Sequence, residues 1–433
     1  MTRVARRVFM ASLLLAAAAA PASARRAQDW RAAALASFDQ TWQTVNDTYY
    51  DPTFRGLDWA SVRDELRPRV ERARDADEAR AVLRLMLARL GQSHFVILSR
   101  SAGHDTLPGD ATVAIDLRAE PAGIDVVRVE PGSNASRDGI DAGDRIVAID
   151  DEQASTWYDE AEGPDERTRL VGVWRRAFRA LHGPSGSRAR LTLVSPDNRQ
   201  RVVNTLRANE RGETVILGNL PPLTVRTRVS EARTPAGRRV GVIAFNVWMT
   251  AISEPFAAAV DSYRNARGIV IDLRGNPGGL AEMMRGIAGH FLAEPALLGR
   301  MHLRTAELEF RANPRRSTSD GRRVEPFAGR VAILIDELTA STSECFTGAL
   351  QSLGRARVFG KTSMGEALPA ATRQLPSGDV LMYAIGDFVT STGVRLEGTG
   401  VTPDQVVLRS REALAAGRDE ALEAALAWMD RDS

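Results

Sequence analysis

The sequence has one cysteine, Cys345, among 433 residues, so no disulfide can form within one chain. A chain of this length buries enough apolar surface to fold without one, so this lack is compatible with an exported protein. Cys345 lies in a predicted helix, and nothing near it in the sequence marks a cysteine nucleophile. We therefore interpret it as a small buried apolar side chain.

Other features are missing as well. No basic run resembles the footprint of a nucleic-acid-binding protein, so no nucleic-acid partner is expected. No group of histidines and carboxylates has the spacing of metal ligands, so neither a metal nor another cofactor is expected. The composition, with 44% hydrophobic and 26% charged residues, is that of an ordinary globular protein.

Residues 1–24 predict a cleavable signal peptide. Arg3, Arg6 and Arg7 precede an apolar run from Val8 to Ala20, and small residues follow up to a cleavage site after Ala24. A short membrane anchor is the alternative, but the run is too short to span a bilayer well. The chain is therefore predicted to be periplasmic or secreted, by the Sec or the twin-arginine route, without a membrane span after cleavage.

Residues 25–104 predict a helical N-terminal domain. Apolar residues recur at helical spacing from about residue 29 to residue 92, with turn signals near Asp51 and Gly56. The recurring positions in the first half are Trp30, Ala34, Phe38, Trp42 and Val45.

Residues 105–208 alternate short β-type runs with turns rich in glycine, proline and aspartate. The segments 129–135, 139–140 and 143–150 resemble, in order and spacing, those of a PDZ domain, and the segments 182–187 and 191–194 fit its end. Such domains bind extended peptide ends by adding a strand to their sheet. The carboxylate-binding loop of a PDZ domain usually carries glycines, and residues 111–115 have none. A scaffold domain that binds nothing is therefore the alternative.

Residues 222–433 predict an α/β core with a largely parallel sheet. Nearly continuous apolar strands at 240–245, 269–273 and 331–335 alternate with helices predicted at 256–265, from about 280 and from about 341.

Two strand-to-helix junctions of this core carry the chemistry. The first, residues 272–279, reads Asp-Leu-Arg-Gly-Asn-Pro-Gly-Gly, and backbone N–H groups at such a turn suit an oxyanion hole. The second places Ser341 at a helix start. A serine there is by itself most often an N-cap, but the two junctions together favour a nucleophile.

These junctions and the later Gly-Thr-Gly-Val-Thr-Pro-Asp run at 398–404 resemble the S41 serine peptidases, that is, the C-terminal processing peptidases and their tricorn-core relatives. The resemblance implies a crotonase/Clp-like peptidase core with a helical N-terminal domain and an inserted PDZ domain. It also implies peptide-bond hydrolysis of a peptide or polypeptide through an acyl-serine at Ser341, and a possible homo-oligomer. Ser343 precedes the glutamate of the family motif and is not the implied nucleophile.

The implied base distinguishes two branches of this group. The processing-peptidase branch uses a lysine, but Glu366 occupies the matching position and Lys361 comes five residues too early. The tricorn branch uses a Ser-His pair and a later glutamate, which Ser93, His94 and Glu397 match.

This resemblance implies that His94 takes the proton of Ser341 and that Ser93 or Glu397 orients the imidazole. The N–H of Thr342, with that of Gly278 or Gly279, would form the oxyanion hole.

Three alternatives stay open: a Ser-Lys peptidase using Lys361, a non-catalytic peptide- or ligand-binding protein on the same fold, and a hydrolase of non-peptide esters or amides. Asp272 and Arg274 are interpreted as scaffold residues. The other histidines are expected to be structural or to lie on the surface; they are His104, His182, His290 and His302.

Overall fold

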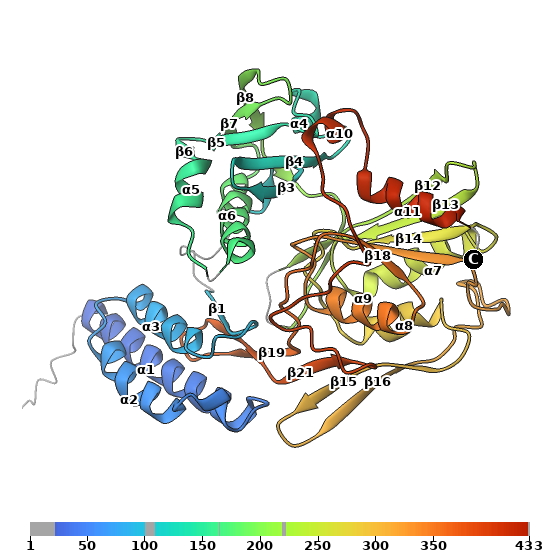
Figure 1. Ribbon diagram of the computed structural model, residues 1–433. Coiled ribbons are helices and arrows are strands. Elements are labelled where there is room, and N and C mark those ends of the chain that lie inside the picture. Colours follow the sequence, from blue (N-terminus) through green and yellow to red (C-terminus); the bar gives the residue numbers. More distant parts are fainter. Residues whose placement is uncertain (1–21, 100–108, 164, 219–221, 432–433) are drawn as a thin grey trace, which may run out of the picture.

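The computed structural model describes residues 22–99, 109–163, 165–218 and 222–431. Residues 1–21 and His104 lie outside this part, so the signal peptide stays a prediction. Figure 1 shows a helical body, a second α+β body above it and a larger core beside both. Within the described residues, no helix combines the length and apolar character that crossing a membrane requires.

The core contains a six-stranded sheet in the order β12-β13-β14-β17-β18-β22. The pair β12–β13 is antiparallel, and every later neighbouring pair is parallel. This confirms the predicted α/β core with a largely parallel sheet. The strands are β12 (Thr227–Arg233), β13 (Arg239–Phe245), β14 (Gly268–Asp272), β17 (Arg330–Ile335), β18 (Arg357–Gly360) and β22 (Gln405–Val406).

Both faces of this sheet are covered, which explains the continuous apolar runs. Successive strand residues point to opposite faces, so Ile269 and Ile271 pack in one apolar cluster and Val270 in another. The first cluster includes α7 (Ser253–Ser262), α8 (Met283–Gly289) and α9 (Thr342–Ser352), and the second includes α11 (Glu420–Asp430). The helix predicted from about Leu280 begins at Met283, and the Leu280 N–H donates to the Trp248 carbonyl at 2.8 Å.

The helical body consists of α1 (Ala22–Thr48), η1 (Phe54–Gly56), α2 (Trp59–Glu71) and α3 (Ala76–Ala88). Its apolar core also contains Leu375 and Leu381, which come from the C-terminal half of the chain. They belong to a hairpin that pairs with β1 (Val96–Leu98), formed by β19 (Ala370–Gln374) and β20 (Val380–Ala384). Arg80 Nε and Asp379 Oδ2 form a buried ion pair across the same contact at 3.0 Å. The two halves of the chain therefore build this body together (Figure 1).

The second body has a sheet in the order β3-β4-β5-β7-β8, with β6 also pairing with β5. Trp157 and Leu191 are among the buried residues of its own apolar core. Its elements are β3 (Ile115–Glu120), β4 (Gly123–Val129), α4 (Asn134–Arg137), β5 (Arg145–Ile149), β6 (Glu152–Gln153), α5 (Ala154–Glu160), α6 (Glu166–Leu181), β7 (Arg188–Val194) and β8 (Gln200–Leu206).

The remaining elements connect or flank these bodies. One three-stranded sheet has the order β16-β15-β21, and two small two-stranded sheets pair β2 with β9 and β10 with β11. Their bounds are β2 (Ala111–Thr112), β9 (Ala208–Asn209), β10 (Glu213–Val215), β11 (Leu223–Val225), η2 (Thr250–Ile252), β15 (Ala296–Leu303), β16 (Glu307–Ala312), β21 (Gly386–Thr390) and α10 (Arg411–Ala415).

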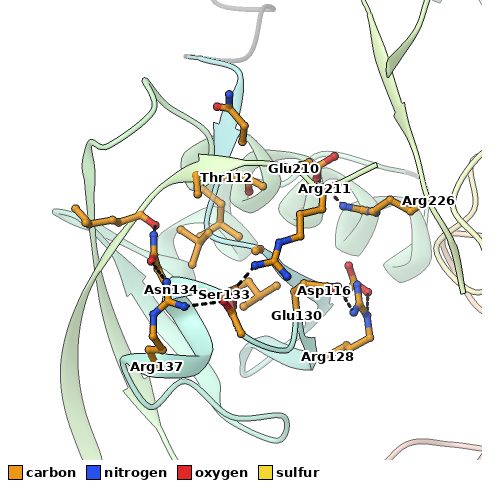
Figure 2. A pocket seen from close by; sticks show the side chains of 18 of the residues that line it. Thr112, Asp116, Arg128, Glu130, Ser133, Asn134, Arg137, Glu210, Arg211 and Arg226 are labelled. Atoms are coloured by element: carbon orange, nitrogen blue, oxygen red, sulfur yellow. Dashed lines mark hydrogen bonds and ion pairs between the residues drawn. The ribbon is translucent and has the colours of Figure 1, made fainter. Parts of the chain in front are cut away.

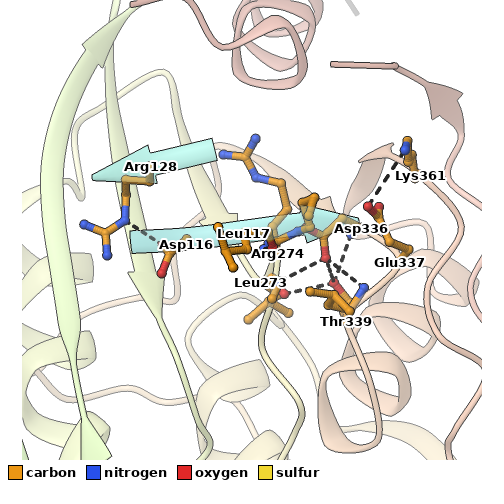
Figure 3. A network of polar contacts seen from close by, with 12 residues as sticks. Asp116, Leu117, Arg128, Leu273, Arg274, Asp336, Glu337, Thr339 and Lys361 are labelled. Atoms are coloured by element: carbon orange, nitrogen blue, oxygen red, sulfur yellow. Dashed lines mark hydrogen bonds and ion pairs between the residues drawn. The ribbon is translucent and has the colours of Figure 1, made fainter. Parts of the chain in front are cut away.

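A buried ion pair joins the second body to the core. Arg118 on β3 contacts Asp336 at 2.6 Å, and their side chains are 8% and 2% exposed. Asp336 Oδ1 also accepts the N–H groups of Gly275 and Leu338, at 2.9 and 3.1 Å. Asp336 therefore binds both strand-to-helix junctions, and Figure 3 shows its contacts around Leu273 and Thr339.

His290, at the end of α8, predicts a pH-dependent stability. It is 3% exposed, and burial lowers its pKa to about 4. The unfolded chain binds this proton near pH 6.5 and the folded chain only near pH 4, so stability is lost as the pH falls through this window. Between pH 7 and pH 4, the free energy of unfolding should fall by roughly 3 kcal/mol more for the wild type than for His290→Gln.

Denaturant unfolding at several pH values measures this difference. His302→Gln controls for the substitution itself, because it makes the same change at a histidine whose side chain is 46% exposed. Parallel curves for the wild type and His290→Gln would contradict the prediction.

Candidate active site

Ser341 lies at the turn between β17 and α9 in a strained conformation. Its φ of 56° and ψ of −122° are rare for a residue with a side chain, and such strain costs about 1–3 kcal/mol. A sharp strand-to-helix turn of this kind exposes a side-chain hydroxyl. Ser341 is the N-cap of α9 and forms a capping box with Glu344, the third residue of the helix.

Glu344 holds this turn in place from behind. Its carboxylate is fully buried and accepts four hydrogen bonds: from the N–H groups of Ser341 (3.1 Å), Gly365 (2.7 Å) and Glu366 (3.0 Å), and from Ser363 Oγ (2.5 Å). Burial raises its pKa to about 7. The Ser341 N–H also donates to the Glu366 carbonyl at 2.8 Å. Glu344 therefore joins the candidate nucleophile to residues 363–366, which we call the strap.

Two backbone N–H groups beside Ser341 donate to no acceptor within the described part of the chain: those of Gly279 and Thr342. Thr342 opens α9, where N–H groups have no partner inside the helix. The Gly278 N–H, by contrast, donates to Asn276 Oδ1 at 2.9 Å. Asn276 is fully buried and also donates to the Phe245 carbonyl at 2.8 Å. Of the two glycines predicted for an oxyanion hole, the hydrogen bonds therefore favour Gly279.

The predicted Ser-His pair and Glu397 meet although they lie about 300 positions apart in the chain. Ser93 Oγ donates to Glu397 Oε2 at 2.9 Å and lies 2.7 Å from His94 Nδ1. Because the single Ser93 hydroxyl proton faces Glu397, the Ser93 oxygen accepts from Nδ1–H of His94. Nε2 of His94 then carries no proton and can act as a base. Glu397 therefore binds Ser93, and Ser93 in turn binds the imidazole of His94.

The strap brings this relay to the candidate nucleophile. The Ala367 N–H donates to Glu397 Oε2 at 2.8 Å, one residue after Glu366, whose carbonyl binds the Ser341 N–H. Burial lowers the pKa of His94, and the negative charges of Glu366 and Glu397 partly oppose this shift. No hydrogen bond joins His94 to Ser341 in the described segments; such contacts often tighten only when substrate binds.

Lys361 lies in a different environment. It is the only lysine in the sequence, and its Nζ is 3.1 Å from Glu120 Oε1 and 3.8 Å from Glu337 Oε1. Figure 3 shows Lys361 directed toward Glu337. Within the described part of the chain it makes no hydrogen bond to Ser341.

The remaining residues of the second junction have structural contacts. Ser343 is fully buried and accepts a hydrogen bond from Trp248 Nε1 at 2.8 Å, so it cannot meet a substrate. Cys345 is buried in α9, as predicted. Arg274 binds Asp272 and Asp419, both at 2.7 Å, and so ties the first junction to the start of α11. Across the described residues, no group of three or more His, Cys, Asp and Glu side chains is placed to hold a metal ion.

A separate cavity of about 130 Å³ lies in the second body, at the loop between β2 and β3. Figure 2 shows Arg137 and Arg211 near Ser133. Both donate to the Gly132 carbonyl, at 2.7 and 3.4 Å, and neither pairs with a carboxylate among the described residues. Phe178, which is 37% exposed, and Leu206, which is 38% exposed, add apolar walls.

Sequence reasoning missed three residues that build the site: Glu344, Asn276 and Arg118. Glu344 follows the candidate nucleophile by three positions, the spacing of a capping box, and this signal could have identified it. Asn276 lies in the glycine-containing junction 272–279, but the sequence predicted no function for it. No signal indicated Arg118, because its partner Asp336 is 218 positions away.

Two family models match parts of this chain. Residues 239–407 match the family model of peptidase family S41, and residues 31–88 match that of the tricorn protease C1 domain. A carboxyl-terminal-processing protease of Picosynechococcus is 28% identical over 377 residues, covering 85% of this chain and 82% of the relative. A chloroplastic carboxyl-terminal-processing peptidase 2 of Arabidopsis thaliana is 26% identical, covering 86% of this chain and 68% of the relative.

Solved structures share the fold. The photosystem II D1 C-terminal processing protease has a TM-score of 0.57 at 21% identity, covering 92% of this chain and 98% of that one. Mature CPAF has a TM-score of 0.63 at 14% identity, covering 92% of this chain and 97% of that one.

The fold and these matches define a serine peptidase, a hydrolase of peptide bonds. This conclusion rests on the match of residues 239–407 to peptidase family S41 and on the similarity to carboxyl-terminal-processing proteases.

Gly278→Ala should disable the site through contact with Ser341. A Cβ at Gly278 would lie 2.6 Å from Ser341 Cβ and 2.9 Å from the Thr342 nitrogen. Displacing a reacting group by about 1 Å can cost about 10²-fold in rate, so labelling by a fluorophosphonate should slow by at least that factor.

The matched control is Gly321→Ala. Gly321 has a similar positive φ of +86°, but nothing lies within 4 Å of the added carbon. It should lose a little stability and keep its labelling rate. A wild-type rate for Gly278→Ala would contradict the packing argument.

Proposed function

We propose that this chain cleaves polypeptides near their carboxyl ends through an acyl-enzyme on Ser341, with His94 as the base. The observation that carries the proposal is the hydrogen-bond chain from Glu397 through Ser93 to His94 Nδ1. This chain favours the tautomer whose Nε2 carries no proton. The names of the carboxyl-terminal-processing relatives support the choice of substrate end.

The reaction proceeds in two halves. Ser341 Oγ attacks the carbonyl carbon of the scissile bond while His94 Nε2 takes its proton, and the carbonyl electrons move onto the oxygen. Collapse of this oxyanion expels the amine, which receives the proton from His94. Water then attacks the carbonyl carbon of the acyl-serine while His94 Nε2 takes a proton from it. Collapse of this second oxyanion releases the carboxylic acid, and His94 returns the proton to Ser341 Oγ.

Two groups would stabilise the charges that develop. The free N–H groups of Gly279 and Thr342 would donate to the oxyanion, and losing one such donor typically costs about 10²–10³-fold in kcat. Glu397, acting through Ser93, would stabilise the imidazolium that His94 becomes. Burial lowers the His94 pKa, which favours the neutral imidazole that a base requires.

The Ser-Lys alternative is less well supported. Lys361 is the only candidate, because the sequence contains no other lysine. Its ammonium contacts Glu120 and Glu337, so it would have to leave two carboxylates and become neutral to act as a base.

Labelling with a fluorophosphonate tests the mechanism. Ser341→Ala and His94→Ala should lose labelling, because they remove the nucleophile and its base. Lys361→Ala should retain it, because this lysine pairs elsewhere. Gel fluorescence after labelling, with circular dichroism as the folding control, gives the comparison.

Loss of labelling with Lys361→Ala and not with His94→Ala would select the Ser-Lys mechanism. A folded wild type that does not label would favour the non-catalytic binding protein. Hydrolysis of esters without any cleavage of peptides would favour a hydrolase of non-peptide substrates.

A second proposal concerns residues 105–208. We propose that this segment is a PDZ domain and that its cavity receives the carboxyl end of a peptide. Arg137 and Arg211, which lack carboxylate partners among the described residues, would bind the anionic end. The exposed faces of Phe178 and Leu206 would contact an apolar last side chain. The glycines of a usual carboxylate loop are absent, and the two arginines would supply the missing donors.

Peptide binding to the Ser341→Ala protein measures this capture without cleavage. A fluorescent peptide with an apolar last residue should bind more tightly with a free carboxylate than with a carboxamide. The double variant Arg137→Gln/Arg211→Gln should remove roughly ten-fold or more of that preference. The control Arg199→Gln changes an 83% exposed arginine of the same body and should bind normally. Equal affinity for both peptides would contradict capture of the carboxyl end.

The place of action stays a proposal. The arginines, apolar run and small residues of 1–24 support export by a signal peptide, and mass spectrometry of the exported protein would locate the cleavage site.

A further inference from the structure

We propose that Arg395 is a positioning residue that fixes the base-bearing loop 91–94 against the loop that carries Glu397. Its guanidinium donates from Nε to Asp387 Oδ2 at 2.6 Å and from Nη1 to the Glu397 carbonyl at 2.9 Å. Nη2 lies 3.3 Å from both Tyr50 Oη and Gln92 Oε1. One side chain therefore binds three separate parts of the chain.

The loop 91–94 needs such external support. Gly91 has a φ of 59° and His94 a φ of 61°, and a positive φ is unfavourable for a residue with a side chain. Gln92 is held by Tyr50 Oη at 3.0 Å and by Arg395, on the side of the loop that precedes the Ser-His pair. A strained loop persists only when its surroundings determine its conformation.

Two connections run in parallel between this loop and the Glu397 segment. The first uses the Glu397 carboxylate, which accepts from the Ser93 N–H and from Ser93 Oγ, both at 2.9 Å. The second uses Arg395, which binds the Glu397 backbone at one end and Gln92 at the other. The first connection orients the imidazole directly. The second sets the distance between the two segments, so that the first can form.

The chemistry of the side chain suits this role. A planar guanidinium presents five N–H donors in a fixed arrangement and stays charged. The Arg395 side chain is 34% exposed and Asp387 is 13% exposed, so Asp387 anchors the guanidinium from the more buried side. A lysine could keep the contact with Asp387, but it could not reach the Glu397 carbonyl and Gln92 together. This inference rests on the proposed role of His94.

The His94 pKa is the direct readout, and it does not require activity. Imidazole NMR resonances of the full chain are titrated with pH in the wild type and in Arg395→Ala, and His94→Gln assigns the His94 signal. Burial is the main cause that lowers the His94 pKa. Loosening the loop lets in water, so the pKa should rise toward 6.5. Arg300→Ala is the control, because Arg300 has a similar exposure of 37% and its ion pairs within the described residues are with Glu307 and Glu309 on the hairpin β15–β16.

Kinetics supply the second readout. Arg395→Ala should lower kcat for a fluorogenic peptide by about 10²-fold with little change in KM, and the acidic limb of the labelling rate should move to higher pH. Arg395→Lys should recover only a small part. Millimolar guanidinium should restore part of the rate of Arg395→Ala and none of any loss in Arg300→Ala.

The outcomes separate the two proposals. An unchanged His94 pKa and an unchanged kcat in Arg395→Ala would overturn the positioning role and leave the proposed mechanism intact. A shifted His94 pKa in a protein whose wild type never labels would support positioning and reject the peptidase mechanism. If Arg395→Ala does not fold, Gln92→Leu removes the contacts of Gln92 with Arg395 and Tyr50 and leaves those of Arg395 with Asp387 and Glu397. Wild-type behaviour of that variant would overturn the inference.

Discussion

The active site depends on one buried carboxylate. Glu344 takes four hydrogen bonds from the nucleophile turn and the strap, and few other groups could satisfy four inward-facing donors at once. An unpaired buried N–H costs about 1–3 kcal/mol, so the strap and the turn are stable only with Glu344 between them. The strained backbone of Ser341 is one result. The second result is that Ala367, the residue after the strap, donates its N–H to Glu397.

From the Ala367 N–H, hydrogen bonds continue through Glu397 and Ser93 to His94, beside the helical body. Glu397 fixes Ser93, Ser93 fixes the tautomer of His94, and the helical body is itself closed by the hairpin β19–β20. The loop that carries the candidate base His94 is therefore joined to the core because the C-terminal half of the chain packs against its beginning. The same sheet that carries Ser341 is held to the second body by the buried pair of Arg118 and Asp336. Each body of the molecule thus contributes a contact to the geometry of one site.

Glu366 occupies the position that matches the lysine of a Ser-Lys pair, so the charge at this position is negative and not positive. A carboxylate next to the nucleophile opposes the lowering of the His94 pKa by burial, whereas a cation there would lower that pKa further. Glu366 also meets Arg175 of α6 at 3.2 Å, so its charge is partly balanced by the second body. A neutral histidine base and an acidic neighbour are therefore compatible, and the single lysine of the chain serves an ion cluster instead.

The strands β13, β14 and β17 and the two glycine- and serine-bearing junctions followed from the sequence, because sheets covered on both faces require continuous apolar runs and sharp turns require particular residues. The family, and with it the candidates Ser341, His94 and Glu397, followed from short motifs whose order is diagnostic.

Local patterns could not decide which partners meet. The contacts of Ser93 with Glu397, Arg118 with Asp336 and Arg80 with Asp379 span 304, 218 and 299 positions. Such contacts leave no periodicity in the sequence, because they depend on how completed bodies pack against one another. Only the tertiary structure showed that Glu344 is buried with four donors, that the Gly278 N–H is already bonded and that Lys361 pairs with Glu120 and Glu337. Each of these results depends on which donors and acceptors folding brings together.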